Sequence, residues 1–390
     1  MKPSYRRTVG ASFAGYIVQA VVNNFVPLLF VTFQSEFKIP LSKITALISI
    51  NFIIQLFVDM FSAGFIKKTG YKAAVITANA CCAAGLAMLS FLPFTLPDPF
   101  TGILICVSIY ALGGGLLEVV ISPLVEACPT KNKEKMMSML HSFYCWGHVG
   151  VVLVSTAFFF LLGIKNWRIL ALIWALLPLA DIVLFINAPI YTVEGDGAGG
   201  LSIPQLFKEK EFWLLAVMMV CAGASEQAQS QWASAFAEEG LKVNKIAGDL
   251  AGPMSFAILM GLSRLIYGKY GDRLDLNKCI IYSSVLCIGT YLCTALAPHP
   301  IFGLIGCALC GFSVGIFWPG TYSMAAKRVK GGGTAMFALL ALAGDFGCAA
   351  GPVLAGTVAD SAGSLRTGVL AAIVFPVIML LAALKHINNK

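Results

Sequence analysis

Two carboxylates of this sequence lie in stretches apolar enough for lipid or a protein interior. Glu118 lies within ALGGGLLEVVISP, residues 111–123, and Glu226 lies within ASEQAQSQW, residues 224–232. A charged side chain at the centre of a membrane helix costs about 2.5–3.5 kcal/mol on insertion scales. Because burial favours the neutral carboxyl, such an acid can bind a proton and release it when water arrives. We therefore predict proton coupling for Glu118 and Glu226; the alternative for Glu118 is an acid that stays protonated and bonds a backbone carbonyl.

Other polar residues recur in apolar stretches at helical spacing. The recurring sets are Tyr16, Gln19 and Asn23, with Asn24 beside them; Asn51, Gln55 and Asp59; His141, Tyr144 and His148; and Glu226, Gln229 and Ser230, with Gln227 and Gln231 beside them. Residues three and four apart are neighbours on a helix, so each set forms a stripe that we expect to face inward. Such stripes can also serve only to hydrogen-bond one helix to another.

The residue types of these stripes suit a polar solute with several hydroxyl groups. Amides and an imidazole can hydrogen-bond hydroxyls, and flat aromatic rings can cover the apolar faces of a sugar. The predicted solute contacts are Asn23, Asn24, His141, Tyr144, Gln229, Gln231, Trp232 and Trp318. The Cys307 and Cys310 pair has no further ligands of the right type nearby, so we expect no metal site, and we expect no cofactor.

The elements that must position these residues follow from the composition. The chain has 390 residues, of which 58% are hydrophobic and only 12% charged, with a mean hydropathy of +0.83; soluble proteins carry about a quarter charged residues. About 20 apolar residues cross a bilayer as a helix, and lipid offers the backbone no partners. Twelve such runs are present, at 9–33, 42–66, 73–94, 101–127, 136–163, 167–187, 211–237, 246–267, 277–298, 300–325, 334–358 and 365–386. We predict an all-α integral membrane protein.

The twelve runs divide into two similar halves. The longest polar stretch follows the sixth run, so we predict one six-helix bundle over 1–187, a cytoplasmic linker over 188–210 and a second bundle over 211–390. The halves also echo each other, since IKKTGYK at 66–72 is answered by YGKYGDR at 267–273. An internal repeat of half the chain is a recurring feature of secondary transporters. The fold predicted is therefore two pseudo-symmetric bundles of six transmembrane helices.

The basic residues set the expected orientation. The N-terminus, the even-numbered loops and the C-terminus hold 20 of the 27 Lys and Arg residues, counting Arg264. This positive-inside bias places both termini in the cytoplasm of a multi-pass plasma-membrane protein, which is the bacterial inner membrane in a prokaryote. The net charge of +8 is spread in short clusters rather than a stripe, which argues against nucleic-acid binding. Apart from the lipid bilayer, the expected partners are a small solute and an ion, and we expect a monomer.

Twelve spans in two halves, with a basic glycine-containing loop repeated after spans 2 and 8, resemble the major facilitator superfamily. Three stretches are similar to its fucose:proton symporter branch of sugar porters: AVVNNFVP at 20–27, GGGLLEVVISP at 113–123 and LHSFYCWG at 140–147. The resemblance places Glu118 on the span-4 glutamate of that branch and Asn24 on a sugar-contacting asparagine. His141 and Tyr144 replace a glutamine and an asparagine, and Pro27 stands where the branch has its proton-carrying aspartate.

The expected function is proton-coupled transport of a small polar solute, a sugar by type, through alternating access of the two halves; Na⁺ is the other ion considered. An exporter of amphipathic compounds is the alternative, but it would need a largely apolar cavity, against which the many amides argue. A membrane receptor that transports nothing is a further alternative. The chain has no H-E-x-x-H, G-x-S-x-G or Walker A pattern, so we expect neither an enzyme nor an ATP-driven pump.

Overall fold

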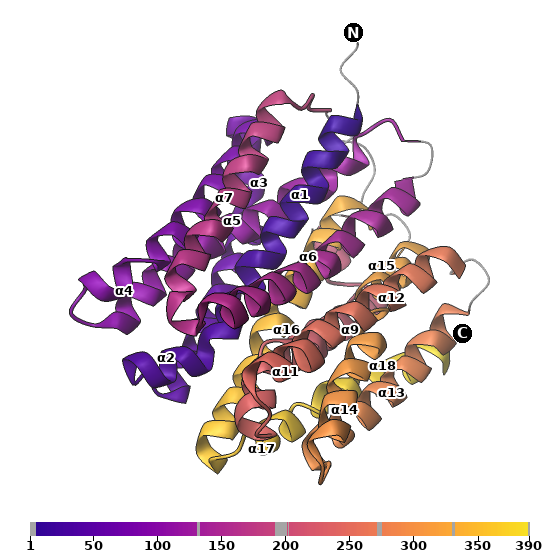
Figure 1. The fold of residues 1–390 in the computed structure, drawn as a ribbon. Helices are drawn as coiled ribbons and strands as arrows, with labels where there is room; N and C mark the ends of the chain where they lie inside the picture. The colour runs from indigo at the N-terminus through magenta and orange to yellow at the C-terminus, as the bar shows by residue number, and fades with distance from the viewer. Residues whose placement is uncertain are drawn as a thin grey trace. The chain divides into compact units, whose positions relative to one another are not determined.

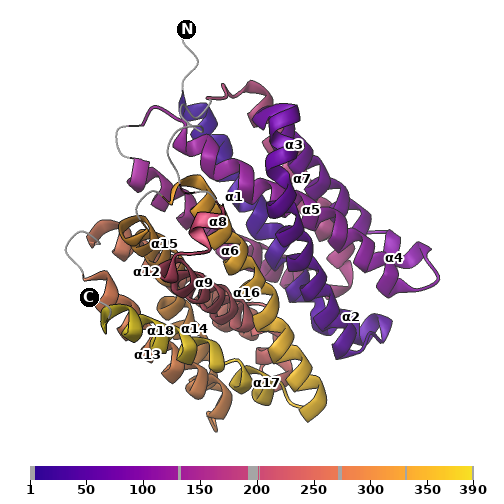
Figure 2. The ribbon, with the colours of Figure 1, turned by 180° about the vertical axis from the view of Figure 1, so that it is seen from behind.

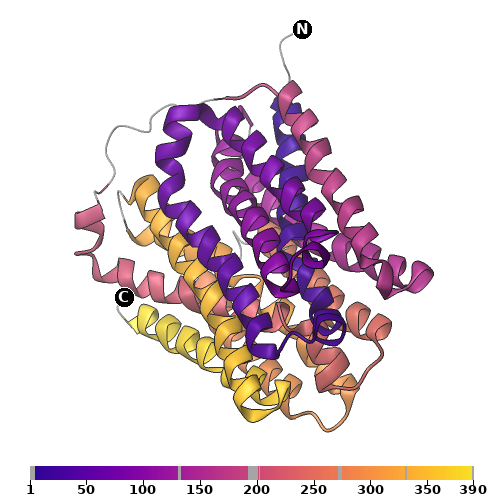
Figure 3. The same ribbon diagram turned by 90° about the vertical axis from the view of Figure 1, so that its left-hand side faces the viewer.

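The computed structural model describes residues 5–130, 133–191, 201, 203–270, 275–329 and 332–388, and it is helical with no strand among them. The chain divides into two compact units, Met1–Glu194 and Gly195–Lys390. Figure 1 and the view from behind in Figure 2 show each unit as a bundle of long helices, and Figure 3 shows the same ribbon turned by 90°. Residues 192–200 and 202 of the predicted linker lie outside the described part of the chain.

The first unit contains the predicted spans 1 to 6. Its elements are α1 (Tyr5–Asn24), η1 (Val26–Leu29), α2 (Phe30–Phe37), α3 (Leu41–Leu89), α4 (Leu92–Thr95), α5 (Pro99–Glu126), α6 (Lys133–Leu162), η2 (Ile164–Asn166) and α7 (Trp167–Asn187). Spans 2 and 3 belong to the single element α3, which is broken only at Gly70, with φ 81° and ψ 159°. The predicted loop at 67–72 is therefore a one-residue break, which glycine permits because it has no Cβ to resist a positive φ.

The second unit contains the predicted spans 7 to 12. Its elements are α8 (Ile203–Leu206), α9 (Lys210–Ser230), α10 (Ala233–Ala235), η3 (Phe236–Gly240), α11 (Lys245–Asp249), η4 (Leu250–Met254), α12 (Ser255–Tyr270), α13 (Leu276–Leu296), α14 (Pro300–Val314), α15 (Phe317–Arg328), α16 (Gly333–Ala362), α17 (Leu365–Ala371) and α18 (Val374–Asn388). The segments η3 and η4 are π-helical turns, and they bound the connection between spans 7 and 8.

Eleven helical segments of the described chain are long and apolar enough to cross a membrane. The predicted span without a match among them begins with α9, which is 21 residues long but carries Glu226 and several glutamines in its second half. The residues predicted to do chemistry thus make this span less apolar than the other eleven. With α9 included, every predicted span is helical, and the chain is an all-α integral membrane protein of twelve transmembrane helices.

Three spans that carry predicted site residues are interrupted. Span 1 changes from α-helix to a 3₁₀ turn after Asn24, next to Pro27, because proline has no backbone N–H and clashes with the preceding turn. Span 7 is broken at residues 231–232, and span 10 is broken at residues 315–316. Interrupted helices of this kind hold the substrate and ion sites of many secondary transporters, because their free backbone ends can bind ligands.

Glycines allow the helices that carry the acids to approach their neighbours closely. In α5, a Cβ on Gly113 would lie 2.4 Å from the carbonyl oxygen of Ala78, and one on Gly115 would lie 2.9 Å from the Cα of Gln55. Helix α5 therefore packs directly on the backbone of α3, and the two are neighbours in Figures 1 and 2. The glycine triplet before Glu118 thus sets the position of that carboxylate within the first unit.

Candidate functional site

Glu118 lies on α5, and its partner is on α1. The Gln19 amide nitrogen donates to Glu118 Oε2 at 2.6 Å, while the carboxylate side chain is half-buried. The other end of the same amide, Gln19 Oε1, is buried without a hydrogen-bond partner in the described chain. A glutamine can turn either face of its amide to a neighbour. Gln19 can therefore donate to an ionised Glu118 and, with the amide rotated, accept from a protonated one.

Tyr16 connects the Glu118 helix to the histidine of α6. Its hydroxyl is 3.0 Å from the Ser122 hydroxyl, one turn after Glu118 on α5. Its ring meets the His141 ring edge-on, with centroids 5.2 Å apart. The predicted site residues Glu118 and His141, from spans 4 and 5, thus contact neighbouring side chains of span 1 within one bundle.

The two adjacent asparagines of α1 point to different helices. Asn24 donates to the Tyr144 hydroxyl of α6 at 3.3 Å and to the Ala20 carbonyl at 2.8 Å. Asn23 instead accepts from Gln55 of α3 at 2.9 Å, and from Asn51 at a longer distance. The structure therefore brings Asn24 and Tyr144 together, as the predicted site requires, and turns Asn23 into the contact between α1 and α3.

In the second unit, Glu226 is paired with a basic residue of span 8. Arg264 Nη2 of α12 lies 3.1 Å from Glu226 Oε2 of α9, and both residues are buried. Arg264 is thus inside a helix rather than in the basic loop that follows it. Protonation of Glu226 would remove the negative charge of this pair.

The other predicted residues of span 7 also have protein partners. The Gln229 amide donates to Thr294 of α13 at 3.4 Å, and the Gln231 amide donates to Gln227 at 3.0 Å. The Trp232 indole N–H donates to the Pro352 carbonyl of α16 at 3.1 Å. Trp232 is 1% exposed, so its ring packs within the bundle. These residues adjoin the break in span 7, where Gln229 contacts α13, Trp232 contacts α16 and Gln231 contacts its own helix.

Trp318 occupies the corresponding place in span 10. It is the second residue of α15, directly after the break at 315–316, and it is partly exposed. A Cβ on Gly344 of α16 would lie 2.3 Å from its ring, so the indole rests on a bare helix backbone. Its neighbour Tyr322 has its ring centroid 6.1 Å away.

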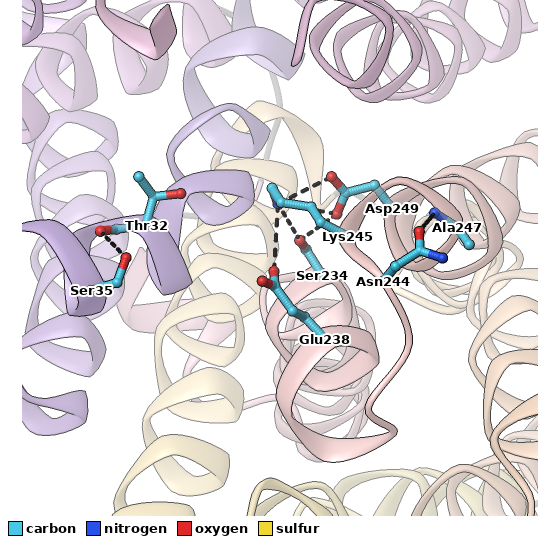
Figure 4. A network of polar contacts seen from close by, with 8 residues as sticks. All are labelled: Thr32, Ser35, Ser234, Glu238, Asn244, Lys245, Ala247 and Asp249. Atoms are coloured by element: carbon cyan, nitrogen blue, oxygen red, sulfur yellow. Dashed lines mark hydrogen bonds and ion pairs between the residues drawn. The ribbon is translucent and has the colours of Figure 1, made fainter. Parts of the chain in front are cut away.

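A further ionic network, absent from the sequence-based site, lies at the connection between spans 7 and 8 (Figure 4). Lys245 lies 3.1 Å from Asp249 and 4.0 Å from Glu238, and Ser234 donates to Asp249 at 2.5 Å. Burial raises the pKa of Glu238, which Lys245 partly opposes. This network ties the end of span 7 to the start of span 8.

The sequence analysis did not predict the two residues that contact the acids, Gln19 beside Glu118 and Arg264 beside Glu226. The sequence analysis placed Gln19 on the span-1 stripe without a role and counted Arg264 among the basic residues of the cytoplasmic side. Both contacts join residues far apart in the chain, 99 and 38 positions respectively. Helical periodicity shows which residues share a face, but it does not show which face of another helix lies opposite. The only sequence signal was the presence of a polar residue of the right type on each stripe.

Comparisons with known proteins agree with this architecture. The family model of the Major Facilitator Superfamily matches residues 11–352 and, in an overlapping match, 255–388. A crystal structure of a variant of the E. coli fucose:proton symporter, FucP, superposes with a TM-score of 0.69 at 18% identity, covering 98% of this chain and 99% of that one. FucP in the outward conformation gives the same TM-score and identity over 97% and 98% of the two chains. No curated protein matches the sequence significantly.

The fold and the family model together identify the class of protein. Twelve transmembrane helices in two six-helix halves form the major facilitator fold, and the chain belongs to the Major Facilitator Superfamily. It is therefore a multi-pass membrane transporter. The similarity to FucP, at 18% identity, shows the fold.

Proposed function

We propose that this transporter takes up a small polar solute of the sugar type together with a proton. The observation that carries the proposal is the Glu118–Gln19 contact of 2.6 Å inside the first bundle. An acid and an amide that can hydrogen-bond in both protonation states form a device for loading and releasing a proton. The fucose:proton symporters among the similar structures support the solute class and the ion.

The residues around Glu118 suit the binding of hydroxyl groups. Tyr16 and His141 present a hydroxyl and an imidazole beside Ser122, one turn from Glu118, and Asn24 and Tyr144 present an amide and a hydroxyl next to the break in span 1. A solute hydroxyl that bonded these groups would replace contacts that they now make with each other. Solute binding can thereby change the environment of Glu118, which is what coupling requires.

In the second unit we propose Glu226 as the second coupling acid, acting together with Arg264. Pro27 stands where the sugar-porter branch has its span-1 acid, so coupling through two acids needs another. Protonation of Glu226 would break its 3.1 Å ion pair with the Arg264 guanidinium. Gln229, Gln231, Trp232 and Trp318 are the proposed solute contacts of this unit, because they adjoin the breaks in spans 7 and 10.

Uptake by the purified protein in proteoliposomes tests the proposal. A panel of sugars, with amphipathic cations as a second panel, is offered with an inward proton gradient, with an inward Na⁺ gradient, or with neither. The proposal expects one sugar or a small group of sugars to accumulate only with the proton gradient. Accumulation of the amphipathic compounds instead, or accumulation driven by Na⁺ alone, would contradict the proposed solute or the proposed ion.

A further inference from the structure

A second buried acid lies in the first bundle, apart from the Glu118 contacts. Asp181 is on α7 and is 1% exposed, and Asn79 of α3, which is fully buried, donates to its Oδ2 at 2.9 Å. The second hydrogen of the Asn79 amide goes to the Val75 carbonyl at 3.1 Å. Because both amide hydrogens are used, the orientation of the amide is set, and Asn79 Oδ1 is left as an acceptor.

Two oxygen atoms of this pair, and a third on α1, are buried and have no hydrogen-bond partner in the described part of the chain. They are Asp181 Oδ1, Asn79 Oδ1 and Ser12 Oγ. Buried polar atoms are nearly always satisfied, and an exception usually marks an ion, a water or a functional group. The three are a carboxylate, an amide carbonyl and a hydroxyl, which are the oxygen ligands that hard cations prefer.

The position of Ser12 follows from two contacts of its own helix. The Thr8 hydroxyl donates to the Pro189 carbonyl just beyond α7. A Cβ on Gly15 would lie 3.3 Å from Asp181 Oδ2. Ser12 lies four residues after Thr8 and three before Gly15, so it is on the same face of α1. That face runs along α7, which places the Ser12 hydroxyl beside the Asp181 region.

Among the described residues, Asp181 forms no ion pair with a basic side chain. The Lys72 ammonium donates to the Ile186 carbonyl, which is five residues further along α7, or about 7.5 Å along the helix at 1.5 Å per residue. Arg6 and Arg7 lie at the exposed start of α1. An ionised carboxylate without a counter-charge is very costly in a low-dielectric interior, so Asp181 needs a cation or a proton.

We propose that Asp181, Asn79 and Ser12 form a buried binding site for one Na⁺ ion. A single carboxylate balances one positive charge, which favours a monovalent ion over Ca²⁺ or Mg²⁺. A proton on Asp181 would also neutralise the charge, but it could be donated to only one of the other two oxygens. One small cation satisfies the charge and several of the oxygens together. The site is formed by spans 1, 3 and 6 alone, and it does not depend on the transported solute.

The test is the thermal unfolding of the purified full-length protein without solute. The midpoint is measured at fixed pH and ionic strength in NaCl, KCl and choline chloride mixtures, with direct binding of ²²Na⁺ as a second measurement. A ligand that binds only the folded state raises the midpoint in a saturable way. We expect NaCl alone to raise the wild-type midpoint, one ²²Na⁺ to bind per chain, and Asp181→Asn to lose both effects.

Two further variants keep the test decisive. Asp345→Asn changes a buried acid of the other unit, so it should retain the full Na⁺ effect. Ser12→Ala removes only a hydroxyl and is expected to fold even if Asp181→Asn does not; it should need several-fold more Na⁺ for half of the shift. The proposal is wrong if wild type responds equally to all three salts. It is also wrong if wild-type stability instead depends on pH and Asp181→Asn removes that dependence, because the site then binds a proton.

Discussion

At the scale of single residues, the acid predicted from its apolar surroundings has a partner that explains its tolerance. Glu118 accepts a hydrogen bond from Gln19 at 2.6 Å, and the remaining Gln19 oxygen is available for a protonated acid. Neutral amides stabilise both forms of a carboxyl group more evenly than a positive charge does. We therefore propose Glu118 as the main proton carrier, ahead of Glu226, which is paired with an arginine.

We predict that Glu118→Gln abolishes proton-driven accumulation but preserves solute exchange. The variant imitates the protonated acid, and its amide can still bond Gln19, so the bundle should fold. The measurement compares uphill uptake with counterflow in the same proteoliposomes. Uphill uptake at the wild-type rate would show that Glu118 is not the proton carrier. A protein that no longer folds would favour a structural role.

Removal of one member of the Glu226–Arg264 pair is predicted to affect both transport and stability. Breaking a buried pair from one side typically costs about 3–5 kcal/mol, because it leaves an uncompensated charge. Arg264→Gln should therefore unfold at a clearly lower temperature, and the Glu226→Gln/Arg264→Gln double variant should recover much of that loss. Transport should be lost in Glu226→Gln, in Arg264→Gln and in the double variant. Among the single substitutions of acids, Glu226→Gln should impair transport more than Asp59→Asn or Asp345→Asn. Normal accumulation by Glu226→Gln would show that the pair serves only packing.

At the scale of elements, the helices that carry the site are positioned by glycine contacts and by breaks. Helix α5 lies on the backbone of α3 through Gly113 and Gly115. The breaks in spans 1, 7 and 10 place Asn24, Gln231 and Trp318 at or beside helix ends. Helix ends carry backbone groups without intrahelical partners, which a ligand can use.

Gly115→Ala is predicted to destabilise the first bundle. The added methyl would lie 2.9 Å from the Cα of Gln55 and 3.2 Å from its carbonyl oxygen, and backbone cannot move aside as a side chain can. Overpacking of this kind costs about 1–3 kcal/mol, and here it would also shift Glu118 away from Gln19. The matched control is Gly150→Ala in α6, where nothing lies within 4 Å of the added carbon. Thermal unfolding should show a lower midpoint for Gly115→Ala only, and equal midpoints would contradict the close contact.

At the scale of the whole molecule, the basic residues argue for one orientation in the membrane. The even-numbered loops and both termini carry most of the 27 Lys and Arg residues, and from the positive-inside rule we propose that they lie in the cytoplasm. The same rule leaves the ionic network at the connection between spans 7 and 8 on the opposite side. The twelve-helix count makes these sides alternate along the chain.

Cysteine labelling tests this topology. We predict that Lys68→Cys and Lys131→Cys are both labelled from the cytoplasmic face, and that Lys165→Cys is labelled only from outside. A membrane-impermeant thiol reagent, applied to intact cells and to inverted vesicles, distinguishes the two faces. Many of the native cysteines are buried, which lowers the background. Labelling of Lys68→Cys and Lys131→Cys on opposite faces would contradict the orientation and the arrangement of six spans in each half.

The membrane class, the twelve spans and the acids within them can be predicted from the amino-acid sequence alone. Apolar run length and the cost of unsatisfied backbone in lipid leave few alternatives, so these features depend on local composition. The Gly70 break shows the limit of this reasoning, because a basic polar stretch predicts a loop whether one residue or six leave the helix.

The hydrogen-bond and ion-pair partners of these polar residues cannot be predicted from the sequence, because they depend on how the helices pack. Asn23 and Asn24 are adjacent in the sequence, yet one bonds α3 and the other bonds α6. Glu118 and Glu226 are the same residue type in similar surroundings, yet one meets an amide and the other a guanidinium. Periodicity orients each helix about its own axis, but partners depend on the rotation and height of the neighbouring helix. Those are set by contacts such as Gly115 on Gln55, summed over the whole bundle.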